Sequence, residues 1–528
     1  MQKTVTEPVM SKPQRPEDER LGVANCLVYG LQHVLTMYGG IIAVPLIVGQ
    51  AAGLSPGDIG LLIAACLFMG GLATLLQTLG LPFFGAQLPL VQGVSFASVS
   101  TILAIVSTNG GPASLGVIFG AVIAASLVGL VITPLFSKII HFFPPVVTGT
   151  VITTIGLTLM PVTANWAMGG NSRAPNYGSM ANIGLAAATL AVVLLLSKVK
   201  SAMISRLSIL LAIVIGTFIA VATGMTDFSK VSNGPIVAFP TPFHFGMPTF
   251  QLAAIVSMCI VMLVILVETS ADILAIGEIV DTHVDTRRLG DGLRADMISS
   301  AIAPIFGSFT QSAFAQNVGL VAVTKVKSRY VVAAGGAILV VLGLLPVLGR
   351  VVAAIPMPVL GGAGVVLFGS VAASGIRTLA RVEYENNMNL VVVATSIAFG
   401  MIPIAKPDFY EHFPAWFGTI FHSGISSSAV MAILLNILFN HIKAGNTEDQ
   451  SVFVAGSNPR SLTPEQLEAF QHGDHYLDGV LYDAQGNEVP VNGQEAGGRR
   501  SPRIDGESSA HGSATPLPRS RKPLAGHH

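Results

Sequence analysis

Apolar runs of about 18 or more residues recur along this chain from Leu27 to Ile442. A run of that length forms a helix long enough to cross the hydrocarbon core of a bilayer. The composition agrees, because 51% of the 528 residues are hydrophobic and only 11% are charged, whereas a soluble domain carries about 25% charged residues. The sequence therefore predicts an all-α membrane protein that crosses the bilayer many times.

Fourteen such runs are candidate spans, in two groups of seven. The first group comprises residues 22–49, 57–79, 84–106, 113–136, 144–163, 180–197 and 206–224. The second group comprises residues 250–276, 289–305, 306–324, 330–349, 356–375, 388–404 and 424–442. The third, ninth and tenth runs are the weakest, because polar residues or glycines interrupt them.

The distribution of Lys and Arg supports this count. Basic residues cluster at the N-terminus and in the even-numbered connections, at Lys3, Lys12, Arg15, Arg20, Lys138, Lys198, Lys200, Arg206, Arg287, Arg288, Arg294, Lys325, Lys327, Arg329, Arg377 and Arg381. The odd-numbered connections hold only Arg173, Lys230, Arg350 and Lys406. Since cytoplasmic loops carry the excess of basic residues, both termini are expected in the cytoplasm.

Two consecutive groups of seven spans must have opposite orientations, which is the inverted-repeat layout of many secondary transporters. The third run of each group is interrupted in a similar way. The first reads PFFGAQLPLVQGVSFASVST and the second reads FGSFTQSAFAQNVGLVAVTK. A matching pair of interrupted spans indicates a transporter's binding site; the alternative is a coincidence between two glycine-rich segments.

The second interrupted run, Phe306–Lys325, is too polar for a continuous span. It contains Gly307 and Ser308 near its start and Gln316 and Asn317 before a final apolar part. Unpaired amides in lipid cost several kcal/mol each. We therefore expect an extended first half and a short helix that begins near Gln316 and lines a cavity. The alternative is a loop with a polar turn between two helices.

Four ionisable residues within these runs are candidates for a role in function: His33, Glu268, Asp272 and Asp296. His33 in the first run is expected to have a functional or helix-bridging role rather than simple packing. Glu268 and Asp272 are four residues apart, so their carboxylates share one helix face. Two like charges in a low-dielectric site cannot both ionise cheaply, which suits a proton-coupled site; the alternative is a solvated pair near a helix end. For Asp296 three roles stay open: a proton relay, a partner of His33 or a helix cap.

Other classes of protein find little support. The chain has no P-loop, no zinc-ligand spacing and no nucleophile–base motif, so neither an enzyme nor ATP-driven transport is expected. The three cysteines form no C-x-x-C pair, and no metal or cofactor is expected. An ion channel stays open as an alternative, because paired carboxylates can line a cation path. After Lys443 the sequence becomes polar, with a turn between two short strands expected at 482–487 and a disordered end.

The motif Gln316-Asn317-Val318-Gly319, followed after four residues by Thr324, resembles the signature of the nucleobase–ascorbate transporters. This family is also called nucleobase:cation symporter-2. Further matches are Gln32 and His33, which resemble the family's QH motif, and the acidic residues Glu268, Asp272 and Asp296. The resemblance covers residues 20 to 443.

The resemblance implies a uracil-permease-like fold of fourteen spans in a 7+7 inverted repeat, with short strands in spans 3 and 10. A core domain (spans 1–4 and 8–11) would move against a gate domain (spans 5–7 and 12–14) as an elevator. The implied divisions are an N-terminal segment 1–21, core 22–136, gate 137–249, core 250–349, gate 350–443 and a cytoplasmic tail 444–528. A homodimer formed through the gate domain, in the lipid of the inner (plasma) membrane, is also implied.

The resemblance further assigns roles to residues. Those implied to bind substrate are Glu268, Gln316, Phe96, Phe314, Ser95 and Asn317. Those implied to support proton coupling or to hold the site are His33, Asp272, Asp296, Gly319, Thr324 and Gln32. Glu268 would accept N–H groups of a base, and the Gln316 amide would face it.

The implied substrate is a purine nucleobase carried with a cation, H+, and no nucleic acid is expected to bind. Uracil permeases have Glu at the position of Gln316, whereas xanthine and uric acid members have Gln. An amide both donates and accepts, which matches the N–H/C=O edge of an oxidised purine. Uric acid and xanthine are therefore favoured over uracil, although Ala271 and Lys325 depart from the family pattern. A transporter of the sulfate-permease type is the other alternative, but Glu268 would repel an anion.

Overall fold

The computed structural model describes residues 15–136, 143–226, 228–229, 231–232, 234–384, 388–442, 475–477 and 480–482. Its helices and strands up to residue 222 are η1 (Pro16–Asp18), α1 (Val23–Ala51), α2 (Pro56–Leu79), β1 (Gln92–Val94), η2 (Phe96–Ser98), α3 (Val99–Asn109), α4 (Ser114–Ile132), η3 (Thr133–Leu135), α6 (Pro145–Thr158), α7 (Met160–Ala167), α8 (Met180–Ser197), α9 (Ala202–Arg206) and α10 (Ser208–Ala222). The rest are α11 (Leu252–Val280), α12 (Thr286–Ile302), η5 (Ala303–Phe306), β2 (Gln311–Ala313), α13 (Ala315–Thr324), α14 (Arg329–Gly343), α15 (Pro346–Ala353), α16 (Met357–Leu379), α17 (Asn389–Ala405), α18 (Ala415–Phe421), α19 (Gly424–Asn436), η6 (Ile437–His441), β3 (His475–Leu477) and β4 (Val480–Tyr482).

The chain is predominantly helical, and among the described residues eight helices are long and apolar enough to cross a membrane. The number becomes nine if α14 and α15, which meet at a bend of 78°, form one span. Each of the fourteen expected runs contains a helix, but α3, α10 and α17 are shorter, and α12 is polar along much of its length. The protein is therefore a multi-pass membrane protein, and the number of fourteen spans stays a prediction.

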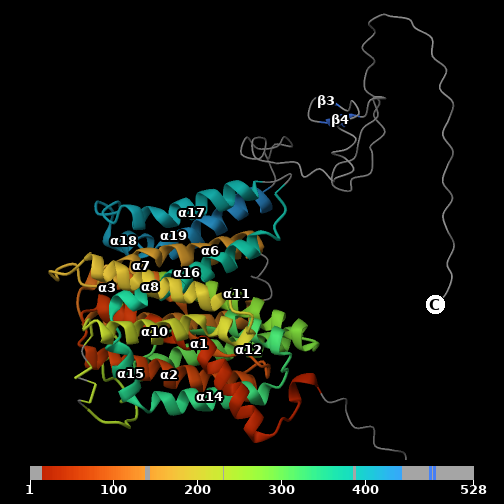
Figure 1. The fold of residues 1–528 in the computed structure, drawn as a ribbon. Helices are drawn as coiled ribbons and strands as arrows, with labels where there is room; N and C mark the ends of the chain where they lie inside the picture. Colours follow the sequence, from red (N-terminus) through yellow and green to blue (C-terminus); the bar gives the residue numbers. More distant parts are fainter. Residues whose placement is uncertain are drawn as a thin grey trace, which may run out of the picture. The chain divides into compact units, whose positions relative to one another are not determined.

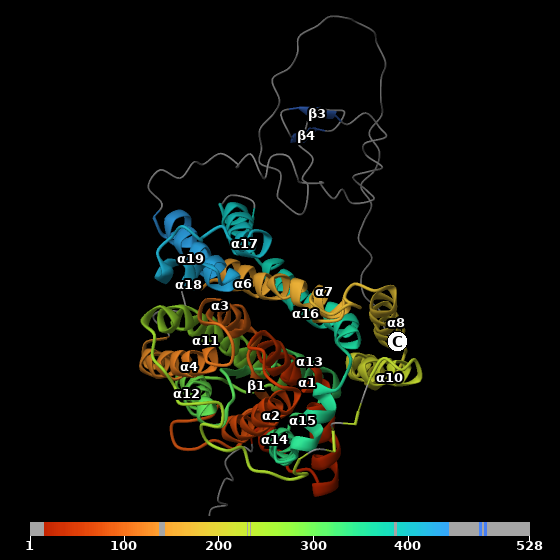
Figure 2. The ribbon, with the colours of Figure 1, turned by 90° about the vertical axis from the view of Figure 1, so that its left-hand side faces the viewer.

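The helices pack in two sets, shown in Figures 1 and 2. One set, called the first helix group, consists of α1–α4 and α11–α15, with its main contacts between α2 and α14, α1 and α14, and α4 and α11. The second helix group consists of α6–α10 and α16–α19, with its main contacts between α6 and α16, α17 and α19, and α8 and α10. Helices far apart in sequence thus lie side by side within each group.

Small residues allow close approach within the first helix group. Gly71 of α2 faces Gly336 of α14, where an added Cβ would lie 2.6 Å from the Gly336 carbonyl oxygen. Helix association in a membrane depends on such close packing, because apolar burial gives little driving force against lipid. A side chain at Gly71 would therefore separate α2 from α14.

A layer of buried hydroxyls lies where the two groups meet. The Thr101 hydroxyl of α3 is 2.8 Å from that of Ser423 and 3.2 Å from that of Ser426, at the start of α19. Ser257 of α11 is 3.3 Å from the Ser426 hydroxyl. All four residues are fully buried. Hydroxyls both donate and accept, so each has a partner in this layer.

The chain divides into two units, Met1–Phe453 and Val454–His528. In the second unit the structure describes only the antiparallel pair β3 and β4, with Leu477 opposite Val480. The turn predicted at 482–487 is misplaced in part, because Tyr482 ends strand β4. Residues 483–487 and the segment predicted to be disordered lie outside the described residues.

Candidate functional site

Two short strands cross inside the first helix group. β1 and β2 pair antiparallel, with Gln92 opposite Ala313 and Val94 opposite Gln311. Each strand leads into a short helix, β1 into η2–α3 and β2 into α13. We call residues 92–109 the first crossing segment and residues 311–324 the second crossing segment. The half-helix expected near Gln316 is present, because α13 begins at Ala315.

Each strand is held at its first residue by a hydroxyl from a neighbouring helix. The Gln92 N–H donates to Thr74 Oγ1 of α2 at 2.9 Å. The Gln311 N–H donates to Ser300 Oγ of α12 at 2.8 Å. These hydroxyls satisfy backbone groups that a two-stranded sheet leaves unpaired at its edges, which permits extended backbone at this depth.

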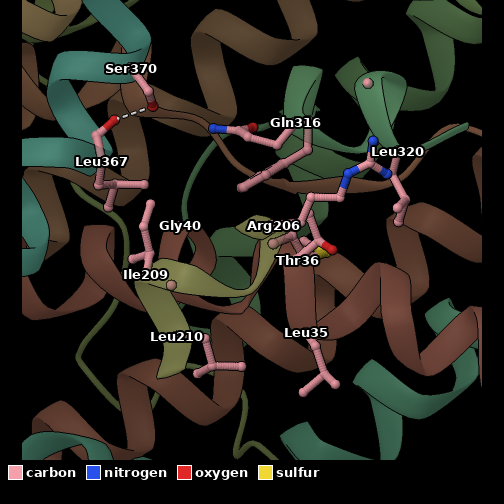
Figure 3. Close-up of a pocket in the computed structure, with 14 residues that line it drawn as sticks. Leu35, Thr36, Gly40, Arg206, Ile209, Leu210, Gln316, Leu320, Leu367 and Ser370 are labelled. Atoms are coloured by element: carbon pink, nitrogen blue, oxygen red, sulfur yellow. Dashed lines mark hydrogen bonds between the residues drawn. The ribbon is translucent and has the colours of Figure 1, made fainter. Parts of the chain in front are cut away.

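The start of α13 faces a cavity of about 270 Å³. No side chain caps this helix at Phe314, and its N-terminal turn carries free N–H groups and a partial positive charge. Gln316 and Gly319 are exposed and line the cavity (Figure 3). The other walls come from α1, the α9–α10 turn and α16, where Ser370 lies. The cavity therefore opens between the two helix groups.

Phe314 lines the cavity, and other aromatic rings pack near it. The Phe96 and Phe314 rings are 6.5 Å apart, centroid to centroid, and Phe96 also packs edge-on against Phe368 of α16. Glycines make room for Phe314: a Cβ added at Gly93 or Gly40 would lie 2.6 Å or 2.8 Å from its ring. The ring position thus depends on residues that have no side chain.

His33 bridges α1 to α13. The Asn317 Nδ2 group is 3.1 Å from His33 Nδ1 and donates to the His33 backbone carbonyl at 3.0 Å. Both residues are buried. His33 therefore bridges two helices, which is one of the two roles expected for it, while its functional role stays a prediction. Asn317 holds the start of α13 instead of facing the cavity.

The three acidic residues lie within electrostatic range of one another. Asp296 is buried on α12 and accepts a hydrogen bond from Thr269 Oγ1 at 2.6 Å. The same Thr269 hydroxyl accepts from the Ala313 N–H of β2 at 3.3 Å. Glu268 and Asp272 lie partly buried on α11, one turn apart. One buried carboxylate oxygen of each aspartate, Oδ2 of Asp272 and Oδ1 of Asp296, has no hydrogen bond to any described residue.

Two interpretations of Asp296 are wrong. It does not cap α12, because that helix begins at Thr286 and Asp285 provides the cap by accepting from the Arg288 N–H. It is also not a hydrogen-bond partner of His33, whose ring meets Asn317. Asp296 lies three turns into the helix, so its carboxylate reaches Thr269 rather than a helix end.

The structure brings only part of the predicted site to the α13 cavity, namely Phe314, Gln316 and Gly319. Glu268 lines a separate small pocket against α6, on another part of the surface between the helix groups. Ser95 is buried and caps η2 by accepting from the Ala97 N–H. Thr324 ends α13 and donates to the Leu320 carbonyl, while Gln32 lies half-buried on α1.

Three residues that belong to the site or line its cavity were not predicted from the sequence to do so. Thr269 links Asp296 to strand β2. The Gln92 side chain lies close to the Asp296 carboxyl, yet neither of its amide atoms has a hydrogen bond to a described residue. Arg206 lines the α13 cavity. The matching pair of interrupted runs offers a signal for Gln92, since it begins β1 as Gln311 begins β2.

Comparison with known proteins gives the family. A profile of a permease family matches residues 24–409. The uric acid transporter UacT of Escherichia coli K12 is 40% identical over 438 residues, covering 82% of this chain and 90% of that protein. The chain belongs to the nucleobase–ascorbate transporter family. The xanthine permease of Bacillus subtilis 168 is 39% identical over 436 residues, with 83% and 98% covered. As a member of a family of permeases, this chain is a transport protein and not an enzyme.

Solved structures share the fold at low sequence identity. The anion transporter Slc26a9 of mouse, in the inward-facing state, matches with a TM-score of 0.55 at 14% identity, covering 80% of this chain and 69% of that one. The transmembrane domain of a cyanobacterial bicarbonate transporter, BicA, matches with a TM-score of 0.50 at 16% identity, covering 80% and 100%. At such identities the likeness concerns the fold alone.

Proposed function

We propose that this permease imports an oxidised purine nucleobase, uric acid or xanthine, together with a cation, H+. The observation that carries the proposal is the similarity over nearly the full length of two relatives named for uric acid and for xanthine. The site supports it, because the Gln316 amide in the α13 cavity can donate and accept along the N–H/C=O edge of such a base.

The cavity also suits a small planar ligand. Its volume of about 270 Å³ is below that of a typical drug-sized pocket. The Phe314 ring offers an apolar surface beside Gln316. Uncapped N–H groups at the start of α13 can meet carbonyl oxygens of the base.

Cation coupling is assigned to the acidic group around α11. Glu268, Asp272 and Asp296 lie close together in the membrane domain. Three carboxyl groups so placed cannot all carry a charge cheaply, which suits them to take up and release one proton. Thr269 connects this group to strand β2, so the charge of the acids is coupled to the position of the second crossing segment.

For the transport cycle we propose an elevator of fourteen spans in an inverted repeat. The first helix group is the core domain (residues 22–136 and 250–349), and the second is the gate domain (137–249 and 350–443). The buried hydroxyls of Thr101, Ser257, Ser423 and Ser426 lie between them and can exchange partners when one group slides. Further parts of the proposal are a homodimer formed through the gate and both termini in the cytoplasm, with the protein in the inner (plasma) membrane.

Uptake of radiolabelled uric acid, xanthine and uracil into cells that express the chain, with and without a protonophore, tests the proposal. We expect saturable purine uptake that collapses with the proton gradient. Uracil uptake alone would make the chain a uracil permease, and uptake that ignores the protonophore would exclude H+ coupling. If no base enters although the protein is in the membrane, an anion transporter of the same fold becomes the better account.

A further inference from the structure

One positively charged side chain, that of Arg206, lines the cavity at the start of α13. Arg206 is the last residue of the short helix α9, and it lines the cavity together with Gln316 (Figure 3). It is half-buried, whereas Lys198 and Lys200 in the same connection are exposed. Arg206 thus differs from its basic neighbours in facing a cavity between the two helix groups.

No acidic residue neutralises Arg206 within the part of the chain that the structure describes. The ion pairs there involve other residues, such as Arg288 with Glu17 and Arg329 with Asp18. Arg206 is also the sole charged residue among those lining the cavity. A partly desolvated guanidinium is ordinarily paired with a carboxylate or a phosphate, so this one is available to an anionic ligand.

We propose that Arg206 binds the anionic form of the transported purine and makes the permease prefer uric acid over xanthine. The inference rests on the proposed function. Uric acid readily loses a proton to give a monoanion at neutral pH, whereas xanthine under the same conditions stays largely neutral. A guanidinium presents a planar fork of donors that matches adjacent oxygen and nitrogen acceptors on such an anion. Gln316 then forms hydrogen bonds with the base, and Arg206 pairs with its negative charge.

The competing role for Arg206 is purely structural. A basic residue at the cytoplasmic end of a span fixes orientation in the membrane, and at a helix C-terminus it complements the helix dipole. Either role would affect membrane abundance, or the uptake of both purines by the same factor. Neither would change the ratio between a charged and a neutral substrate.

The test compares three variants, Arg206→Gln, Arg206→Lys and the matched control Lys200→Gln. KM for uric acid and for xanthine is measured at one neutral pH, together with the amount of protein in the membrane. For Arg206→Gln we expect KM to rise about tenfold for uric acid and to change less than about twofold for xanthine, since one partly desolvated charge contact corresponds to about a factor of ten. Arg206→Lys keeps the charge but lacks the planar fork, so it should lose part of the preference, and Lys200→Gln should match the wild type.

Equal changes for the two purines, or none, in Arg206→Gln protein of normal abundance would overturn the role of Arg206 and leave the proposed function intact. If Arg206→Gln fails to reach the membrane, Arg206→Lys decides, because an ammonium group lacks the planar fork of donors. A KM that rises for uric acid and not for xanthine supports the proposal, and KM values that change equally or not at all contradict it. Wild-type protein that takes up neither purine would remove the proposed function, and this inference with it.

Discussion

The two crossing segments have the same architecture but different surroundings. In each, a short strand begins with Gln, is held by a hydroxyl from a neighbouring helix and leads into a short helix. The first crossing segment is buried from its strand to residue 106, apart from the half-buried Phe96 and Leu103, and Ser95 caps its helix start. The second has an uncapped start and exposes Gln316 and Gly319 to the cavity. We therefore propose that the first segment acts as a structural support and that the second binds the substrate.

This difference shows how one structural unit, used twice, can serve two purposes. Burying one copy fixes its backbone, because its strand is held by hydrogen bonds to β2 and to the Thr74 hydroxyl. Opening the other copy leaves donors free for a substrate without destabilising the fold. Substitutions in the first segment should therefore reduce stability, and substitutions in the second should change transport.

The largest effect is expected at Glu268, outside both segments, to which we assign cation coupling in the proposed function. Glu268→Gln removes the titrating group, so uptake should fall by about 100-fold or more while the protein stays in the membrane. Glu278→Gln on the same helix, at an exposed position, is the matched control and should transport normally. Wild-type-like uptake by Glu268→Gln would remove this residue from the mechanism.

A methyl group in the first segment should damage the site through packing. In Gly93→Ala the new Cβ would meet the Phe314 ring at 2.6 Å and Met37 at 3.0 Å. Overpacking of this kind costs about 1–3 kcal/mol, so both the unfolding temperature in detergent and purine uptake should fall. An unaltered variant would mean that the Phe314 ring moves freely.

The hydroxyls of Thr74 and Ser300, each of which holds the first residue of a strand, should contribute equally to stability. Thr74→Val leaves the Gln92 N–H without its partner, and Ser300→Ala does the same to the Gln311 N–H. A buried unpaired N–H costs about 1–3 kcal/mol, so each variant should lower stability against unfolding by that amount without altering substrate preference. Thr223→Val, which removes an exposed hydroxyl bonded to its own helix, is the control. A loss in only one of the two variants would break the structural equivalence of the segments.

The smallest effect is expected at Gly319. A Cβ at this position meets no atom within 4 Å, and Ala favours a helix over Gly by about 1 kcal/mol. Gly319→Ala should thus fold as well as the wild type but take up space in the cavity, raising KM by about two- to fivefold (roughly 0.4–1 kcal/mol). Uptake kinetics and thermal unfolding, measured on both variants, would distinguish this change in KM alone from the combined loss of uptake and stability in Gly93→Ala. A loss of stability in Gly319→Ala would contradict the open surroundings of Gly319.

Much of the second crossing segment could be predicted from sequence, because polar residues inside an apolar run allow few structures. Gln316 and Asn317 identified a broken span, and α13 begins beside them. The role of Asp296 could not be predicted, because it depends on which face of α12 turns toward Thr269. Arg206 appeared only as a loop charge, since its place in the cavity follows from the packing of α9 between distant helices.

The most direct test of the account is the substrate profile of Gln316→Glu. A carboxylate only accepts hydrogen bonds, so it cannot donate to the carbonyl of an oxidised purine. We predict that uptake of uric acid and xanthine relative to uracil falls by about tenfold or more, with unchanged stability because Gln316 is exposed. An unchanged profile in well-expressed protein would show that the second crossing segment does not read the base, and would contradict the account.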